Sequence, residues 1–432
     1  MKRPLVIGLL VVALLFVLAG IGAVLFFTMN GFAVNNPFDR NNISSVVEEN
    51  KTFEVDAKEP VILSVQDDAG DVIVTGGDVD TVEVKIVKTA YDSTQARADE
   101  EVKTIPYTIV QNGNQLTLKY EIPKSMNFRN KVNTVDFIVT VPSETEVTID
   151  TNGDVAVSGV KGDADLHTSF GDMDVENLKG SLNMDSSNGD IKVLSVDASG
   201  KDVSVDSSFG DITLEQVKSR DITVTSSNGT ITFTNVRATG DVYTKSSFGD
   251  ISYENGSSDS LTVESSNGRI SVTKFNIKQN MAIDTSFGDI DLINASAGSY
   301  DLKTNNGDLT IDGVQGSLKA HTDFGDVDIT NAKSVTLDLD TNNGNIDFSG
   351  SFGKGPHSIS TEFGNVTLSI PDGTNLNVSL NTAFGDINSD IPITVTLTGD
   401  LKDNQRDGVM NEGGDLLTIN TNNGDIDIKA IK

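Results

Sequence analysis

The residues of this sequence that could do chemistry are acidic side chains that recur at a fixed spacing. An aspartate follows a glycine in most copies of a short phrase that returns about every 19–20 residues. If the copies stack one strand apart, about 4.8 Å, the carboxylates could hold calcium. These aspartates are Asp154, Asp172, Asp190, Asp211, Asp250, Asp289, Asp308, Asp326, Asp386 and Asp425.

A second interpretation competes with calcium binding. The calcium-binding roll uses the nonapeptide G-G-x-G-x-D, which this sequence lacks. The aspartate series is also interrupted, by Thr230, Arg269, Asn345 and Asn365. Asp and Asn side chains commonly accept hydrogen bonds from backbone amides in tight turns. We therefore favour aspartates that stabilise turns, and we assign no metal ligand.

The sequence offers little for catalysis. It has no cysteine, and its three histidines are His167, His321 and His357. His167 and His321 stand on the side of a strand that we expect to face solvent. No zinc-protease, serine-hydrolase or phosphate-binding motif occurs. Some β-helical enzymes process acidic polysaccharides with residues on long side loops, but the turns here are short. We predict that the chain is not an enzyme and has no catalytic residue and no cofactor.

The repeated phrase, of the type S-S-N-G-D-I or T-S-F-G-D-I, must position these side chains. A fixed period of this order indicates a solenoid, and it outweighs local signals. The phrase glycines are Gly153, Gly171, Gly189, Gly210, Gly229, Gly249, Gly268, Gly288, Gly307, Gly325, Gly344, Gly364, Gly385 and Gly424.

Each repeat reads as two short strands and two turns. Apolar residues alternate with polar ones on both sides of the phrase, as in Leu182 and Met184 before it and Ile191 and Val193 after it. Period-two alternation is typical of strands. The phrase itself is then a corner, and we expect its glycine to adopt φ > 0 in every copy. Gly249→Val should therefore be costly. Gly424→Val should cost less, because its coil would end the stack.

The residue two places before each corner shares the parity of the apolar side chains. A buried hydroxyl needs a partner, so we expect a column of inward hydroxyls bonded to the next coil. Its members are Thr168, Ser186, Ser207, Ser226, Ser246, Ser265, Thr285, Thr304, Thr322, Thr341, Thr361 and Thr382.

The corner residue before the glycine alternates between Asn and Phe from Asn152 to Phe363. One coil per repeat would interleave the two types in one column. One coil per two repeats would separate them into ladders. We favour one coil per repeat, because two strands and two turns can close a narrow coil. The alternation fails along the sequence between Phe363 and Phe384, which indicates a relaxed column rather than two strict ladders.

The N-terminus has the pattern of a membrane anchor. Lys2 and Arg3 precede an uncharged apolar run from Leu5 to Phe27. As a helix this run would span roughly 35 Å, enough for the hydrocarbon core of a bilayer. The basic residues before it predict a cytoplasmic N-terminus. A cleaved secretion signal is the alternative, but its apolar region would be shorter.

The predicted fold is therefore an all-β, single-stranded β-solenoid (β-helix) of about 19–20-residue coils, with β-rich caps and an N-terminal transmembrane helix. A helical composition around Ser93 to Thr104 interrupts the first cap, and a degenerate phrase surrounds Gly70. After the solenoid we expect a hairpin and one closing strand. We divide the chain into a cytoplasmic tail (1–4), a transmembrane helix (5–28), a linker (29–50), an N-terminal β cap (51–149), the solenoid (150–388) and a C-terminal cap hairpin with its closing coil (389–432).

The amino-acid composition limits the classes of molecule that the chain could bind. The formal net charge is −31, with 39 glycines and no tryptophan. Nucleic acid and anionic lipid surfaces both require a basic face, so we predict no nucleic-acid partner. Solubility of a long, surface-rich molecule is sufficient to explain the charge.

The phrases also resemble those of a known family. Repeated G-D-I and G-D-V phrases after S-S-N or S-S-F, the apolar N-terminus, a K-T-F-E-V opening and a final N-N-G-D-I-D-I are similar to the bacterial putative-adhesin, β-strand-repeat family of unknown function. The resemblance covers roughly residues 51–432. It implies a cell-envelope protein, sometimes linked to envelope stress, and assigns no catalytic residue.

Two classes of function follow. The chain could be a membrane-anchored extracytoplasmic module that binds a protein or an envelope polymer, or it could be a structural or sensory stalk. An exposed aromatic stripe would favour binding, and Tyr243, Tyr253 and Tyr300 are the candidates. The predicted location is the cell membrane, crossed once, with the bulk of the chain outside.

Overall fold

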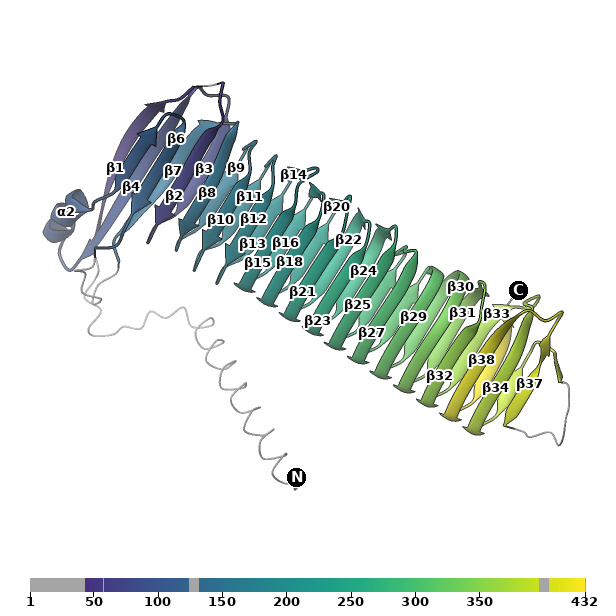
Figure 1. The fold of residues 1–432 in the computed structure, drawn as a ribbon. Coiled ribbons are helices and arrows are strands. Elements are labelled where there is room, and N and C mark those ends of the chain that lie inside the picture. Colours follow the sequence, from purple (N-terminus) through teal and green to yellow (C-terminus); the bar gives the residue numbers. More distant parts are fainter. Residues whose placement is uncertain (1–42, 57, 124–131, 396–403, 432) are drawn as a thin grey trace.

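The solenoid is one long stack of strands, seen in a computed structural model that describes residues 43–56, 58–123, 132–395 and 404–431 (Figure 1). The predicted membrane segment, residues 5–28, lies outside the described residues. Within the described ranges, no helix is long and apolar enough to span a bilayer.

The strands fall into three groups along the chain. The N-terminal end contains β1 (Ile43–Glu54), β2 (Val61–Asp67), β3 (Val72–Gly77), β4 (Thr81–Asp92), the helix α2 (Gln95–Thr104), β5 (Thr108–Asn112), β6 (Gln115–Tyr120) and β7 (Thr134–Pro142). The sequential coils contain β8 (Thr145–Thr151), β9 (Val155–Ser158), β10 (Ala164–Thr168), β11 (Met173–Glu176), β12 (Leu182–Ser186), β13 (Ile191–Leu194), β14 (Asp197–Ala198), β15 (Val203–Phe209), β16 (Ile212–Glu215), β17 (Lys218–Ser219), β18 (Ile222–Asn228), β19 (Ile231–Thr234), β20 (Arg237–Ala238), β21 (Val242–Phe248), β22 (Ile251–Ser258), β23 (Leu261–Asn267), β24 (Ile270–Ile277), β25 (Asn280–Phe287), β26 (Ile290–Ile293), β27 (Ser299–Asn306), β28 (Leu309–Asp312), β29 (Gln315–Phe324), β30 (Val327–Asn343), β31 (Ile346–Phe352), β32 (His357–Phe363) and β33 (Val366–Pro371). The C-terminal end contains β34 (Leu376–Phe384), β35 (Ile387–Ser389), β36 (Ile393–Val395), β37 (Gln405–Met410), β38 (Asp415–Asn423) and β39 (Ile426–Ile431).

Each repeat forms one coil, as we favoured. Equivalent residues of successive repeats pair in parallel: Ser207 with Ser226, and Ser226 with Ser246. The coil also contains a feature that the alternation did not predict. A third, very short strand, such as β17 or β20, pairs from coil to coil in the second turn.

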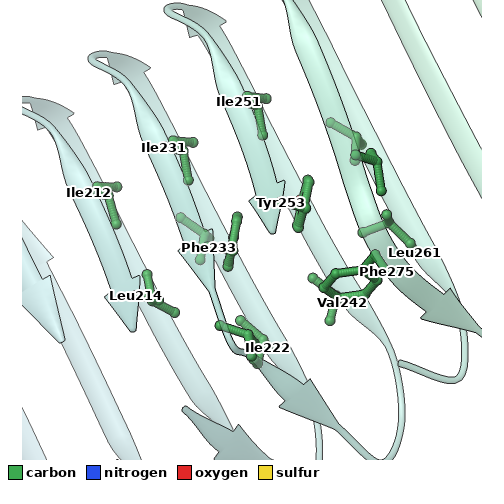
Figure 2. Packing of buried hydrophobic residues seen from close by; sticks show 14 of the residues in the cluster. Ile212, Leu214, Ile222, Ile231, Phe233, Val242, Ile251, Tyr253, Leu261 and Phe275 are labelled. Carbon is green, nitrogen blue, oxygen red and sulfur yellow. The ribbon is translucent and has the colours of Figure 1, made fainter. Parts of the chain in front are cut away.

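The interior is filled by the alternating apolar side chains of both strands. Ile222 and Val242 occupy equivalent places in neighbouring coils, as do Phe233 and Tyr253 (Figure 2). The rings of Phe233 and Tyr253 stack with centroids 4.4 Å apart. Because no coil can bury both of its open sides alone, each depends on its neighbours for a dry interior.

The N-terminal end does not stack in sequence order. The coil formed by β2 and β3 lies between β6 and β7 on one side and β8 and β9 on the other. Gly70, in the degenerate phrase, therefore takes its place beside Gly153 in the corner column.

Antiparallel strands cover this end. β4 pairs with β7, and β1 pairs with β4. The predicted helix is present as α2, which buries Ala98 and Val102. Because β1 begins at Ile43, residues 43–50 are strand and not linker, which corrects our boundary at this point.

The C-terminal end holds a second departure from sequence order. The predicted hairpin is present, since β37 pairs antiparallel with both β36 and β34. The closing strands, however, do not end the stack. β38 lies between β32 and β34, and β39 lies between β33 and β35. The last coil of the chain, β38 and β39, is thus inserted between the coil of β32 and β33 and the coil of β34 and β35.

The phrase glycines are packed backbone to backbone. A Cβ added to Gly249 would lie 2.0 Å from the carbonyl oxygen of Gly229, and one added to Gly171 would lie 2.1 Å from that of Gly153. A left-handed φ, between 127° and 148°, occurs at only five of them: Gly189, Gly210, Gly229, Gly249 and Gly268. Our expectation of φ > 0 in every copy is therefore wrong. Close approach between coils excludes a side chain throughout the column.

The inward hydroxyls are buried as expected, and they divide largely by residue type. The threonines bond to a glycine carbonyl oxygen, with the exception of Thr285, which has no partner among the described residues. The Thr168 hydroxyl donates to the carbonyl oxygen of Gly153 in the neighbouring coil at 2.7 Å. The same bond to a phrase glycine recurs at Thr151, Thr304, Thr322, Thr341, Thr361, Thr382 and Thr421. Ser186, Ser207, Ser226 and Ser246 have no hydrogen-bond partner among the described residues. These serines belong to the coils whose glycines are left-handed.

We predict that Gly424→Ala loosens the inserted coil. Gly424 has two corner neighbours, Gly364 and Gly385, so our view of it as a terminal residue is corrected. The added Cβ would lie 1.9 Å from the carbonyl oxygen of Gly364, and such overpacking costs ~1–3 kcal/mol. Amide hydrogen exchange in β38 and β39 should accelerate. The control is Gly373→Ala, where the new Cβ has no neighbour within 4 Å. Equal exchange in the two variants would contradict the contact.

We also predict that the two kinds of hydroxyl differ in energy. Thr322→Val removes the donor to Gly307 and should cost about 1 kcal/mol. Ser226→Ala removes a buried hydroxyl without a protein partner and should be close to neutral. Denaturant unfolding of both variants measures the difference. A larger loss for Ser226→Ala would show that the serine hydroxyls have partners of their own.

Candidate interaction surface

The corner phrases build one continuous edge of the solenoid. The buried hydroxyls lie on its inner side, and the glycines form its spine. Outward of these run two columns of larger side chains, the aspartates after each glycine and the Asn or Phe before it. These two columns are the part of the edge that a partner could touch.

The aspartates form a ladder along the backbone. The Asp154 carboxylate accepts the amide N–H of Asp172 at 2.9 Å, and the Asp172 carboxylate accepts that of Asp190 at 2.8 Å. The amide acceptor role that we favoured is therefore present, but the amide belongs to the next coil rather than to the same turn. Asn345 serves in the same way for Asn365 at 2.9 Å.

The ladder does not assemble a cation site. In the described part of the chain, no three or more His, Asp or Glu side chains are grouped to hold a metal ion. Arg269 replaces one aspartate and pairs instead with Asp289 and Asp291, each at 2.7 Å. One oxygen of most ladder carboxylates is already bonded to the backbone, which makes them structural parts of the edge.

The three histidines form no common site among the described residues. His167 is partly exposed, 3.4 Å from Asp185, and His321 lies 3.0 Å from Asp340. Both are on the outer strand face, where the parity placed them. His357 is buried and accepts a hydrogen bond from the backbone amide of Leu337.

The pKa values of two buried titratable groups are shifted mainly by desolvation. Burial lowers the pKa of His357 and raises the pKa of Asp67 to about 8. Asp67 occupies the place in β2 that Thr151 occupies in β8, so it belongs to the column of inward side chains, between Thr151 and Tyr120 of β6. Each group is perturbed by its apolar surroundings rather than by a catalytic partner. Neither supplies an acid–base pair.

Of the three candidate tyrosines, only Tyr243 reaches the surface, where it is partly exposed on the outward side of β21. Tyr253 and Tyr300 are only 1% and 2% exposed, because both point into the core. The exposed rings belong to the corner phenylalanines instead. We call these residues the phenylalanine row: Phe170, Phe209, Phe248, Phe287, Phe324, Phe363 and Phe384.

The row is unusually open for apolar side chains. Its five inner members expose between 54% and 58% of their surface, while Phe170 and Phe384 near the ends expose 72% and 76%. Strand parity alone would turn these rings inward, since each stands two places after a buried hydroxyl. The strand ends at the corner, however, and the chain turns there so that the ring points out. The sequence did contain a signal of this exposure, because a polar Asn occupies the same corner position in alternate repeats.

The alternation of Phe and Asn is complete in space. Phe209 lies beside Asn228, and Asn228 lies beside Phe248, and the pattern continues along the stack. The break that the sequence shows between Phe363 and Phe384 is closed by the inserted coil. Asn423 in β38 lies between them and is in register with both. Our interpretation of a relaxed column is therefore corrected.

Three of the corner asparagines are hydrogen-bonded to the neighbouring coil. Asn152, Asn188 and Asn267 each donate a side-chain N–H to a main-chain carbonyl oxygen of the neighbouring coil, namely that of Asp68, Ser169 and Ser247. These side chains are thus held back against their own rod. Exposed rings therefore alternate along the edge with the shorter Asn side chains, and we call the space above each Asn, between two rings, a recess.

Comparison with known proteins identifies the repeat. The family model described as "Toastrack DUF4097" matches residues 62–293 and 255–429. No curated protein matches the sequence.

Two solved structures are similar to this chain at low identity. One is titled a "putative cell adhesion protein" from Clostridium sporogenes, at 10% identity and a TM-score of 0.18, covering 90% of this chain and 100% of the other. The second is titled a "putative adhesin" from Bacteroides fragilis, at 16% identity and a TM-score of 0.29, covering 59% and 96%.

Proposed function

Because the chain belongs to the toastrack DUF4097 family, we propose that it is a membrane-anchored, extracytoplasmic adhesion module of the cell envelope. It binds its partner through the phenylalanine row and carries out no catalysis. The partner is a protein or an envelope polymer, and not a nucleic acid, since the net charge is −31.

The observation that carries this proposal is the row itself. Soluble proteins rarely leave large apolar side chains exposed in a continuous series, and such series mark interaction sites. Aromatic side chains are also enriched among the residues that dominate binding energy. Here seven rings project along one edge, while the core is already full without them.

Membrane attachment rests on the sequence. The apolar run 5–28 serves as the anchor, and Lys2 with Arg3 holds the N-terminus in the cytoplasm. The rod then stands outside the membrane, with its N-terminal end closest to the bilayer.

A structural or sensory stalk is the second candidate. The evenness of the coils and the antiparallel strands at both ends favour it, because a spacer needs only length and protected edges. A stalk, however, gives no reason for exposed phenylalanines where Asn fits the same corner.

We predict that the row mediates attachment to envelopes. Vesicles carrying the full-length chain should bind envelopes from cells that produce it. The triple variant Phe209→Asn, Phe248→Asn and Phe287→Asn should lower that binding at least tenfold, about 1.4 kcal/mol or more. Each new Asn enters a corner that Asn already occupies in adjacent coils, so the fold should be retained.

The matched control changes exposed apolar residues away from the corner. Ile73 and Ile293 are 39% and 41% exposed, and Ile73→Asn with Ile293→Asn should leave binding unchanged. Cosedimentation measures the bound fraction. If the triple variant bound as well as the wild type, the row would not be the binding surface. If neither variant nor wild type bound, the stalk would be favoured.

We predict the topology separately. Protease added to intact spheroplasts should degrade the solenoid, because the basic N-terminus places the remainder of the chain outside. Degradation should be complete without detergent. Full protection until the membrane is dissolved would overturn the proposed orientation.

A further inference from the structure

We propose that the occupant of the phenylalanine row is a second copy of this chain. The two rods pack antiparallel along their corner edges, and each ring of one rod enters a recess above an Asn of the other. The inference rests on the proposed function, because it names the partner of the same surface.

Shape is the first argument. The rings project at every second coil, and the intervening Asn side chains are shorter, with those of Asn152, Asn188 and Asn267 bonded to the main chain of the neighbouring coil. Such an edge is complementary to itself once it is shifted by one coil. The insertion of Asn423 between Phe363 and Phe384 preserves this property up to the end of the row.

Period is the second argument. Strands stack about 4.8 Å apart, so the rings recur about every 9.6 Å. Three residues of an extended strand span about this distance, but an odd step turns successive side chains to opposite faces. An α-helix repeats about every 5.4 Å, so neither element presents one face to all seven rings. A second copy of the rod has the same ring spacing, because it is the same chain. Its rings and asparagines therefore stay in register with those of the first copy along the whole row.

Symmetry selects the antiparallel arrangement. A twofold axis perpendicular to the rods can pass midway between a Phe coil and an Asn coil, and it then places every ring opposite a recess. Such an isologous contact closes on itself as a dimer. A parallel pair would need a one-coil stagger, which leaves different surfaces unpaired at the two ends.

The exposed area is sufficient. A phenylalanine can bury roughly 150–250 Å², so seven rings that are more than half exposed offer on the order of 800 Å² per partner, the size of a standard interface. The neighbouring backbone and Ser side chains would add to this area.

Charge predicts how the pair responds to salt. Each chain carries a net charge of −31, and the twofold axis places both aspartate ladders on the same side of the contact. The ladders repel each other, so added salt should strengthen the dimer by screening the repulsion. A cationic partner would show the opposite dependence.

The test uses the full-length chain in lipid vesicles, with no other protein present. Wild-type vesicles should cluster, as measured by light scattering, and clustering should increase between low and moderate salt. Vesicles with Phe209→Asn, Phe248→Asn and Phe287→Asn should cluster at least about tenfold more weakly.

A second variant separates interlocking from general apolar adhesion. Asn228→Phe with Asn267→Phe fills two recesses with rings, in corners that accept Phe in adjacent coils. Interlocking predicts that these vesicles also cluster more weakly. Stronger clustering would overturn the proposed packing, because added apolar surface alone would then explain the effect.

Orientation is read from labelled chains, which is simple because the sequence has no cysteine. Val110 in β5 and Gly373 before β34 lie at opposite ends of the stack, and Val110→Cys and Gly373→Cys accept a donor and an acceptor dye. Energy transfer should occur between vesicles labelled at different ends and not between those labelled at Val110 alone. The reverse result would overturn the antiparallel pair.

This test and the envelope experiment fail independently. If pure vesicles did not cluster while envelopes still captured the chain through the row, the partner would be another molecule. The proposed function would then stand and this inference would fall. If envelopes captured the chain independently of the row, the proposed binding surface would fall as well.

Discussion

The contact on which the rest of this structure depends is the approach of one glycine backbone to the next at the corner. With hypothetical Cβ atoms only about 2 Å from the neighbouring carbonyl oxygen, no side chain fits in this column. The same approach brings the Thr hydroxyls within reach of the glycine carbonyls and brings each aspartate within reach of the following amide. The inner and outer columns are therefore in register because the glycines are.

This dependence explains how far the sequence could predict the fold. The period, the alternation and the inward hydroxyls all follow from local spacing, and each of them is present. The physical cause of the glycine was misjudged, since a sequence displays turn geometry but not the neighbour across a coil boundary. The order of stacking was misjudged for the same reason. A period shows that copies are equivalent, but it does not show that Gly424 lies between Gly364 and Gly385.

The candidate site was hidden by a rule that works elsewhere in the chain. Strand parity correctly buries Thr168 and Ser207, and it fails two residues later at Phe170 and Phe209 because the chain turns at the corner. We named Tyr253 and Tyr300 as exposed candidates without applying this rule, although both share the parity of buried neighbours and are themselves buried. What distinguishes the corner is that Phe exchanges with Asn there, an exchange that a packed interior does not tolerate. The exposed phenylalanines are thus residues that the fold itself does not require, which is why we propose an interaction site at this edge.

The inserted last coil also limits how a rod of this kind can change its length. At both ends the coils stack in an order that differs from their order in the sequence. A new coil therefore cannot simply be added at either terminus. It must enter among the sequential coils between them. A single added coil would place two rings or two asparagines side by side, whereas a pair keeps the pattern. Insertions that preserve the alternation of Phe and Asn therefore add coils in pairs, and each pair lengthens the rod by about 10 Å.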